Sequence, residues 1–220
     1  MHEKLQAALL SAPRPFYESD GIAIYHGDCR RVLPFLQEFD LLLTDPPYGI
    51  NADANHAHNA GKNGWKCHGE TNWDSERPPK SIFHMMIEAS RQQIIWGGNY
   101  FTDILPPTMR WLVWDKGQRN FSLADVEFAW TSQQKAARVF DYSRAKALQD
   151  GKVHPTQKPV ALMRWCLDLV REAETVLDVF MGSGTTLLAA KLEGRHAVGI
   201  EQQEKYCEIA AKRLEQGLLF

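Results

Sequence analysis

Short apolar segments alternate along the chain with longer segments whose apolar residues recur at helical spacing. The apolar segments predict seven strands: Gly21–His26, Asp40–Thr44, Gln93–Trp96, Arg110–Trp114, Asp125–Thr131, Thr175–Val179 and Ala197–Glu201. The longer segments predict five helices: Arg31–Gln37, Lys80–Arg91, Lys158–Arg171, Thr185–Leu192 and Glu204–Gln216. This alternation is typical of α/β proteins, so we expect a doubly wound, mostly parallel seven-stranded sheet covered by helices.

Two polar stretches interrupt the alternation. Residues 51–79 are rich in Asn, His, Gly and Lys, and residues 133–153 are polar and basic. Both stretches border strands whose carboxyl ends are expected at the active cleft, so we predict that they form its walls. The length of 220 residues, with 44% hydrophobic and 24% charged residues, suits one domain that spans residues 1–220.

The sequence carries no sign of a membrane or secretory protein. No apolar run approaches the roughly 18 to 20 residues that cross a membrane, and the first residues lack a basic region followed by an apolar one. Four widely spaced cysteines favour free thiols in a reducing compartment. We therefore expect a cytoplasmic protein without a metal, although a site built from His56, His58, Cys67 and His68 is an alternative.

Charge is distributed unevenly along the chain. The net charge of −2 gives no global sign of nucleic-acid binding. From Thr131 to Lys158, however, six basic residues stand against two acidic ones, which makes this stretch +4 and the remainder −6. A local basic surface is compatible with contact to a phosphate backbone, and a solvated loop is the alternative.

Asp45-Pro46-Pro47-Tyr48 follows a strand-like run, so it is expected at the carboxyl end of a buried strand, where α/β sheets bind their ligands. Two prolines lack N–H donors and fix φ, which leaves the Pro46 carbonyl free to accept a hydrogen bond beside the Asp45 carboxylate. This pair of acceptors suits an –NH₂ group of a substrate. Tyr48 adds a ring able to stack on a base swung out of a duplex.

A second motif, Asp178 to Thr186, joins an apolar strand to a helix through Gly182-Ser183-Gly184. Glycine lets the backbone approach a ligand closely, and Glu201, 17 residues after Gly184, can accept from both hydroxyls of a ribose. Leu187 stands where a dinucleotide motif has a third small residue, so S-adenosylmethionine fits better. A structural turn, or a site for another nucleotide, is the alternative.

Asp28 is a further acid at the end of a predicted strand. It is suited to accept a hydrogen bond from the adenine amino group of that cofactor. The alternative is an N-cap of the predicted helix Arg31–Gln37.

Together these motifs resemble the DNA amino-methyltransferases, the adenine-N6 and cytosine-N4 family. The segments that carry the resemblance span most of the chain: Asp45 to Gly49, Trp96 to Phe101, Trp114 to Lys116, His154 to Pro159 and Asp178 to Thr186. Because the catalytic turn precedes the cofactor glycines, the order is similar to the permuted β group of that family. The resemblance implies a methyltransferase fold that binds S-adenosylmethionine and double-stranded DNA.

The resemblance also implies roles for individual residues. Asp45 and the Pro46 carbonyl would hold the target amine, with Pro47 in the same turn and Tyr48 stacked on the flipped base. The residues implied to line the cofactor are Asp28, Asp45, His154, Thr156, Gln157, Lys158, Asp178, Phe180, Gly182, Ser183, Gly184, Thr185 and Glu201.

Only short segments are available for DNA recognition, so recognition of the site is expected to be brief, degenerate or shared across a homodimer. Our candidates for DNA contact lie in the two polar stretches: Lys62, Trp65, Lys66, Arg77, Arg138, Arg144 and Lys146. Each of them has an ordinary loop residue as its alternative.

The resemblance favours adenine over cytosine, because cytosine-N4 members more often carry Ser in place of Asp45. The expected activity is therefore site-specific methylation of adenine N6 with base flipping, as in restriction–modification. Cytosine-N4 methylation is the first alternative, and methylation of an RNA or a protein amide is the second. Cytosine-C5 methylation needs a cysteine nucleophile, commonly after proline, and no cysteine here follows a proline.

Overall fold

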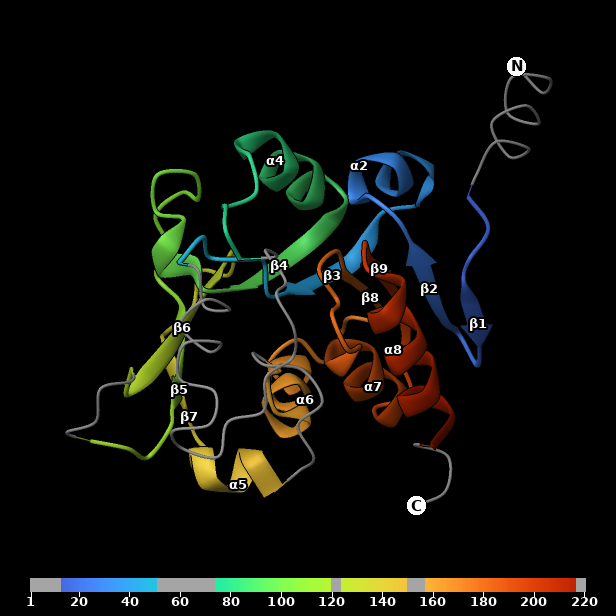
Figure 1. The fold of residues 1–220 in the computed structure, drawn as a ribbon. Coiled ribbons are helices and arrows are strands. Elements are labelled where there is room, and N and C mark those ends of the chain that lie inside the picture. Colours follow the sequence, from blue (N-terminus) through green and yellow to red (C-terminus); the bar gives the residue numbers. More distant parts are fainter. Residues whose placement is uncertain (1–12, 51–73, 120–123, 150–156, 217–220) are drawn as a thin grey trace.

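The computed structural model describes residues 13–50, 74–119, 124–149 and 157–216, which form one nine-stranded sheet with helices on both faces (Figure 1). The strands are β1 (Tyr17–Ser19), β2 (Ile22–His26), β3 (Phe39–Thr44), β4 (Ser90–Trp96), β5 (Trp111–Asp115), β6 (Val126–Thr131), β7 (Arg138–Asp141), β8 (Thr175–Asp178) and β9 (His196–Glu201). Their order across the sheet is β1-β2-β9-β8-β3-β4-β6-β5-β7.

The centre of the sheet is parallel and its margins are mixed. β2, β9, β8, β3 and β4 run parallel to one another, and β7 runs parallel to β5. β1, β6 and β5 make antiparallel pairs. The predicted doubly wound, mostly parallel α/β fold is confirmed.

The predicted number of seven strands is wrong, because the sheet also includes β1 and β7. β1 has only three residues, and β7 is an edge strand whose side chains are mostly exposed. Neither strand buries a face, so neither has the apolar pattern that would predict it. The stretch 133–153, expected to be irregular, contains β7 and a short helix.

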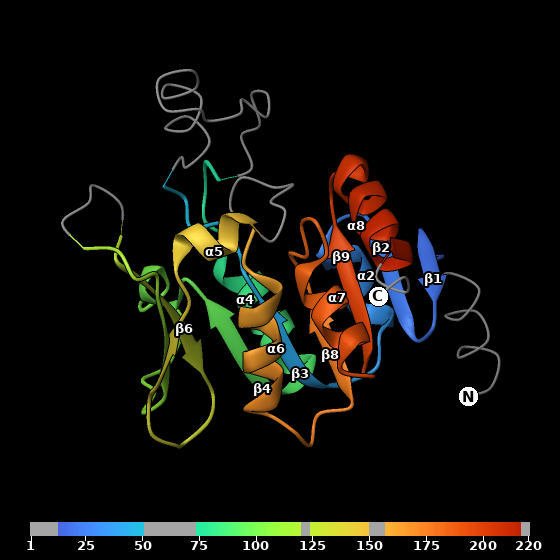
Figure 2. The same ribbon diagram turned by 90° about the horizontal axis from the view of Figure 1, so that it is seen from below.

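The helices form two layers. They are α2 (Cys29–Val32), α4 (Lys80–Glu88), α5 (Arg144–Gln149), α6 (Val160–Asp168), α7 (Thr185–Leu192) and α8 (Glu204–Gln216), with the 3₁₀ turns η1 (Leu33–Phe35) and η2 (Gly98–Tyr100). α2 and α4 cover one face of the sheet, and α6, α7 and α8 lie over the other (Figures 1 and 2).

Prolines explain two differences from the expected helices. The helix predicted at Arg31–Gln37 is wrong, because Pro34 lacks a backbone N–H and the segment forms the short α2 followed by η1. The helix predicted from Lys158 begins only at Val160, since a residue before proline is disfavoured in the α conformation and Pro159 follows Lys158. Lys158 therefore extends away from α6. The bounds of α7 and α8 match the prediction.

β3 shows how the sheet joins the two layers. Leu41 and Leu43 pack toward α6, α7 and α8, whereas Leu42 between them packs toward α2 and α4. All three side chains are fully buried, because successive side chains of a central strand point to opposite covered faces. Each contributes roughly 1.5–3 kcal/mol by leaving water, which fixes the strand that carries the catalytic turn.

The parallel strands end at one edge of the sheet, and the chain turns in opposite directions on the two sides of the β8–β3 boundary. After β3 the chain continues through α4 to β4, and after β8 it continues through α7 to β9. Ligands of α/β sheets bind outside the strand ends at such a switch point. Asp45, Asp178 and Glu201 all lie there. Within the described ranges, no helix is long and apolar enough to cross a membrane.

Candidate active site

Asp45 follows β3, and its carboxylate is held from two sides. Oδ2 accepts a hydrogen bond from Lys158 Nζ at 2.5 Å, and Oδ1 accepts one from the Tyr48 hydroxyl at 2.6 Å. The Asp45 side chain keeps 21% of its surface exposed. Among the described residues, none donates a hydrogen bond to the Pro46 carbonyl. The turn therefore offers a ligand one carboxylate and one carbonyl oxygen.

A buried acid holds the far side of this turn. The Asp74 carboxylate accepts hydrogen bonds from the backbone N–H groups of Tyr48 at 2.6 Å and Gly49 at 2.9 Å. Gly49 has φ +72°, and a Cβ there would lie 2.9 Å from the Arg77 backbone nitrogen. A larger residue at this position would force the turn to shift. The backbone beyond the two prolines is thus fixed.

Tyr48 lies in a bed built by the segment after β4. Its ring stacks on that of Tyr100, with centroids 4.7 Å apart, and meets Phe101 edge-on. Gly97 makes this position possible, because a Cβ there would lie 2.0 Å from the Tyr48 ring. The predicted stacking ring is therefore locked in place, and its hydroxyl is aimed at Asp45.

Behind Asp45 lies a buried chain of alternating charges. Lys158 Nζ lies 2.5 Å from Asp45 Oδ2 and 3.1 Å from Glu127 Oε2, and Glu127 Oε1 lies 2.6 Å from Lys116 Nζ. The Lys158 side chain is only 5% exposed. We call Lys116, Glu127, Lys158 and Asp45 the charge chain. Its members come from β5, β6, the segment before α6 and the turn after β3.

Burial and neighbouring charges act against each other within the charge chain. Burial raises the pKa of Asp45, and the charge of Glu127 adds to this, whereas Lys158 lowers it. Burial alone would also raise the pKa of Glu127, but Lys158 and Lys116 outweigh it and lower that pKa to about 2. Burial would lower the pKa of Lys158, yet the two carboxylates leave it raised.

The second motif forms the other side of the site. Asp178 ends β8, and its Oδ1 accepts hydrogen bonds from Thr44 Oγ1 at 2.7 Å and the Phe180 N–H at 3.1 Å. Burial raises the pKa of Asp178 to about 6. Glu201 ends β9 and accepts from the N–H groups of Gly182 at 3.1 Å and Gln203 at 2.8 Å. Burial raises the pKa of Glu201 as well.

The glycine turn between these two acids is fixed from behind. Gly184 has φ +76°, and a Cβ there would lie 2.7 Å from the Ala210 Cβ on α8. Arg213, also on α8, donates to the Ser183 carbonyl at 2.5 Å and to Thr185 Oγ1 at 3.3 Å. Ser183 Oγ donates to Gln157 Oε1 at 3.2 Å.

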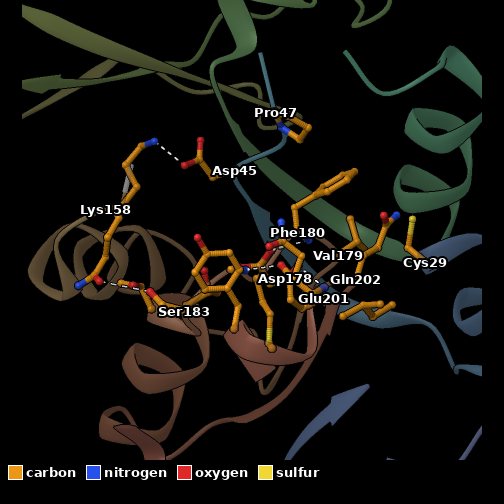
Figure 3. A pocket seen from close by; sticks show the side chains of 18 of the residues that line it. Cys29, Asp45, Pro47, Lys158, Asp178, Val179, Phe180, Ser183, Glu201 and Gln202 are labelled. Carbon is orange, nitrogen blue, oxygen red and sulfur yellow. Dashed lines mark hydrogen bonds and ion pairs between the residues drawn. The ribbon is translucent and has the colours of Figure 1, made fainter. Parts of the chain in front are cut away.

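A cavity of about 240 Å³ lies between the two motifs. Lys158 and Asp45 point toward each other at one end, and Glu201, Gln202 and Cys29 lie toward the other (Figure 3). Predicted residues that line the cavity are Asp45, Pro47, Gln157, Lys158, Asp178, Phe180, Gly182, Ser183, Thr185 and Glu201. Residues that also line it without being predicted are Cys29, Met163, Val179, Met181, Thr186, Ile200, Gln202, Gln203 and Tyr206.

Some predicted residues do not line the cavity. Pro46 and Tyr48 lie behind its wall, and Gly184 faces α8. The Asp28 carboxylate accepts from Arg30 N at 2.9 Å as the N-cap of α2 and pairs with the Arg30 guanidinium. The helix-cap interpretation is therefore the one this side chain shows. His154 and Thr156 lie outside the described residues.

The candidates for DNA contact are spread over different surroundings. Arg77 forms an ion pair with Asp103 and donates to the Tyr100 carbonyl, so it braces the catalytic bed. The exposed residues Arg138 on β7 and Arg144 and Lys146 on α5 lie close in sequence.

Lys62, Trp65 and Lys66 lie outside the described residues, as do His56, His58, Cys67 and His68 of the alternative metal site. In the described part of the chain, no three His, Cys, Asp or Glu side chains could hold a metal ion.

Comparison with known sequences agrees with this geometry. Residues 95–212, more than half of the chain, match a family described as DNA methylase, the N6/N4 methyltransferases. The Type II methyltransferase M2.DpnII of Streptococcus pneumoniae is 27% identical, and the match covers 92% of each chain. The Type II methyltransferase M.ScaI of Streptomyces caespitosus is 25% identical over 92% of this chain and 84% of its own.

Solved structures share the fold. The M1.HpyAVI–SAM complex is 21% identical, with a TM-score of 0.54 over 88% of this chain and 99% of its own. The PvuII DNA methyltransferase, described as cytosine-N4-specific, is 15% identical, with a TM-score of 0.60 over 91% of this chain and 89% of its own.

Proposed function

Because the chain belongs to the N6/N4 DNA methylase family, we propose that it transfers a methyl group from S-adenosylmethionine to the N6 amino group of adenine in double-stranded DNA. One observation carries the proposal. A single cavity at the carboxyl edge of the sheet holds the Asp45 carboxylate at one end and the Glu201 carboxylate at the other.

The residues around the glycine turn suit S-adenosylmethionine. Glu201 offers carboxylate oxygens to a ribose, and the turn of Gly182 and Gly184 keeps side chains away from a ligand. Phe180 and Ile200 add apolar surface for a purine ring, and Gln157 and Ser183 lie toward the Asp45 end for the polar amino-acid portion. When bound, this cofactor supplies a methyl group on a sulfonium centre.

Asp45 and the Pro46 carbonyl prepare the target amine. The amine of a nucleobase is a poor nucleophile, because its lone pair is delocalised into the ring. Two acceptors that take its hydrogen bonds direct the lone pair and stabilise the positive charge that grows on nitrogen. Pro47 shapes the cavity wall beside them, and no covalent intermediate with the protein is required.

The target base has to leave the duplex to reach this turn, which lies at the edge of a cavity. Tyr48 supplies an aromatic surface fixed by Tyr100 and Gly97. Cytosine-N4 methylation is the alternative, because the same two acceptors suit any exocyclic amine and the PvuII enzyme of similar fold is described as cytosine-N4-specific.

The chain is proposed to be one methyltransferase domain, residues 1–220, in which stretches 51–79 and 133–153 contact DNA. The exposed residues Arg138, Arg144 and Lys146 support the second contact, since clustered cations bind the phosphate backbone. A homodimer would widen this surface.

Nucleoside mass spectrometry tests the proposal directly. The purified protein is incubated with duplex DNA and methyl-labelled S-adenosylmethionine, and the digested DNA is analysed. We expect labelled N6-methyladenine. Labelled N4-methylcytosine would replace adenine with cytosine as the target, and absence of both modified bases across varied DNA would contradict the proposal.

A further inference from the structure

We propose that Lys158 and Glu127 are positioning residues which act through Asp45: Lys158 keeps the negative charge on Asp45, and Glu127 holds Lys158 in place. This inference rests on the proposed function, because it assigns to Asp45 the acceptor role in amine methylation. It differs from the role implied by the resemblance, in which Lys158 bounds the cofactor.

The contacts of Lys158 place it on the catalytic carboxylate. Its Nζ lies 2.5 Å from Asp45 Oδ2, 3.1 Å from the Tyr48 hydroxyl and 3.1 Å from Glu127 Oε2. All three acceptors are oxygens of the protein itself, which matches the three donors of an ammonium group. Because Lys158 is 95% buried, water screens these contacts weakly.

Glu127 gives Lys158 a second anchor. One of its oxygens lies at Lys158 and the other at Lys116, which is itself only 14% exposed. A buried lysine beside a single carboxylate pays a large desolvation cost, which good geometry and further partners offset. The four alternating charges sum to zero, so the charge chain is stable as a unit.

Every charged or titratable neighbour of Asp45 contributes a known sign. Lys158, from the segment before α6, lowers the pKa of Asp45, as does the hydrogen bond from Tyr48 on its own turn. Glu127 on β6 raises it, Lys116 on β5 compensates Glu127, and Asp178 on β8 is a further acid nearby.

Opposite signs make the inference testable by pH. If Asp45 acts as a carboxylate, kcat/KM falls as pH falls through the pKa of Asp45. Lys158→Met removes the cation, so this acid limb is expected to move to higher pH by about one unit or more. Activity near pH 7 then falls about 10-fold or more and is partly regained at pH 9.

Glu127→Gln breaks the same chain with the opposite consequence. The amide still hydrogen-bonds both lysines, but the negative charge that raises the pKa of Asp45 is gone, so the acid limb moves to lower pH. Lys158→Arg keeps a cation and is expected to leave the limb within about half a unit of wild type. Lys191→Met is the matched control, because Lys191 is a mostly buried lysine paired with Asp20 outside the cavity.

Limbs that stay in place, or that move in the same direction in both variants, would overturn the inference while labelled DNA from the wild type leaves the proposed function intact. A loss of S-adenosylmethionine affinity in Lys158→Met without a moved limb would return Lys158 to the cofactor.

A second readout does not depend on activity. Carbon-13 NMR of aspartate-labelled protein, with the Asp45 signal identified by its loss in Asp45→Ala, follows the ionisation of Asp45 directly. The same opposite shifts are expected there, and unmoved titration curves would contradict the inference even if the wild type methylated no DNA.

Discussion

The two ends of the cavity are built in different ways. At the cofactor end, contacts are local: Asp178 accepts from a backbone N–H two residues on, and Glu201 accepts from the N–H of Gly182, 19 residues away. At the catalytic end, Asp45 pairs with Lys158, 113 residues away. A site for a cofactor thus arises from one strand–turn–helix unit, whereas the catalytic charge arises only when the whole sheet closes.

The two ends also neutralise acids by different means. Backbone N–H groups hold Asp178 and Glu201, and burial raises the pKa of both. Lysines hold Asp45 and Glu127. Fixed dipoles suit the recognition of neutral hydroxyls, and a cation suits a carboxylate that must stay ionised.

The largest expected effect separates the two ends by a single methyl group. Gly97→Ala places a Cβ 2.0 Å from the Tyr48 ring, so Tyr48 has to leave its bed and its hydroxyl loses Asp45. We expect methyl transfer to fall about 100-fold or more, as when a transition-state contact is lost, while cofactor affinity changes little. Single-turnover rates and cofactor titration measure the two.

Gly194→Ala is the control for that experiment. Gly194 has a similar φ of +68°, but a Cβ there would meet no atom within 4 Å, so the change carries the backbone cost alone. Equal losses of activity in both variants would show that strain, rather than displacement of Tyr48, is responsible.

The cofactor end is tested by Glu201→Ala. Loss of an acceptor for the ribose is expected to raise the cofactor Kd about 10- to 100-fold, since hydrogen bonds to a charged group contribute roughly 1.5–3 kcal/mol. The rate at saturating cofactor should stay near that of wild type. Glu204→Ala, at an exposed position of α8, serves as control. An unchanged Kd would remove Glu201 from the cofactor site.

Arg213→Met has a smaller expected effect. Arg213 holds the Ser183 carbonyl and Thr185 but does not line the cavity, so its loss loosens the glycine turn without removing a ligand contact. We expect a Kd about 3- to 10-fold higher, the equivalent of one ordinary hydrogen bond, with the Asp45-dependent rate unchanged. The exposed neighbour Lys212→Met is the control. A fall in the saturated rate instead would link the two ends.

The same comparison explains what the sequence predicts. The glycine turn and α7 follow from residues 175–192 alone, because strand, glycines and helix are neighbours in the chain. The Asp45 turn follows likewise from β3 and two prolines. Local pattern is enough wherever the site is made within one unit.

Glu127 and Lys116 could not be predicted in this way. Glu127 stands in β6, and only the pairing of β6 with β4 and β5 brings it to Lys158. The segment Trp114 to Lys116 signalled that Lys116 matters, but no spacing in the sequence indicates its partner. Asp74 is a similar case, since it follows a long polar stretch and reaches back to the Tyr48 backbone.

Asp45→Ala tests the central claim most directly, with methyl transfer and cofactor binding measured on the same sample. The account predicts that transfer to DNA falls about 1000-fold or more, because the charged acceptor of the amine is lost, while the S-adenosylmethionine Kd stays within about threefold of wild type. Transfer within about tenfold of wild type, or a Kd that rises in step with the lost rate, would contradict it.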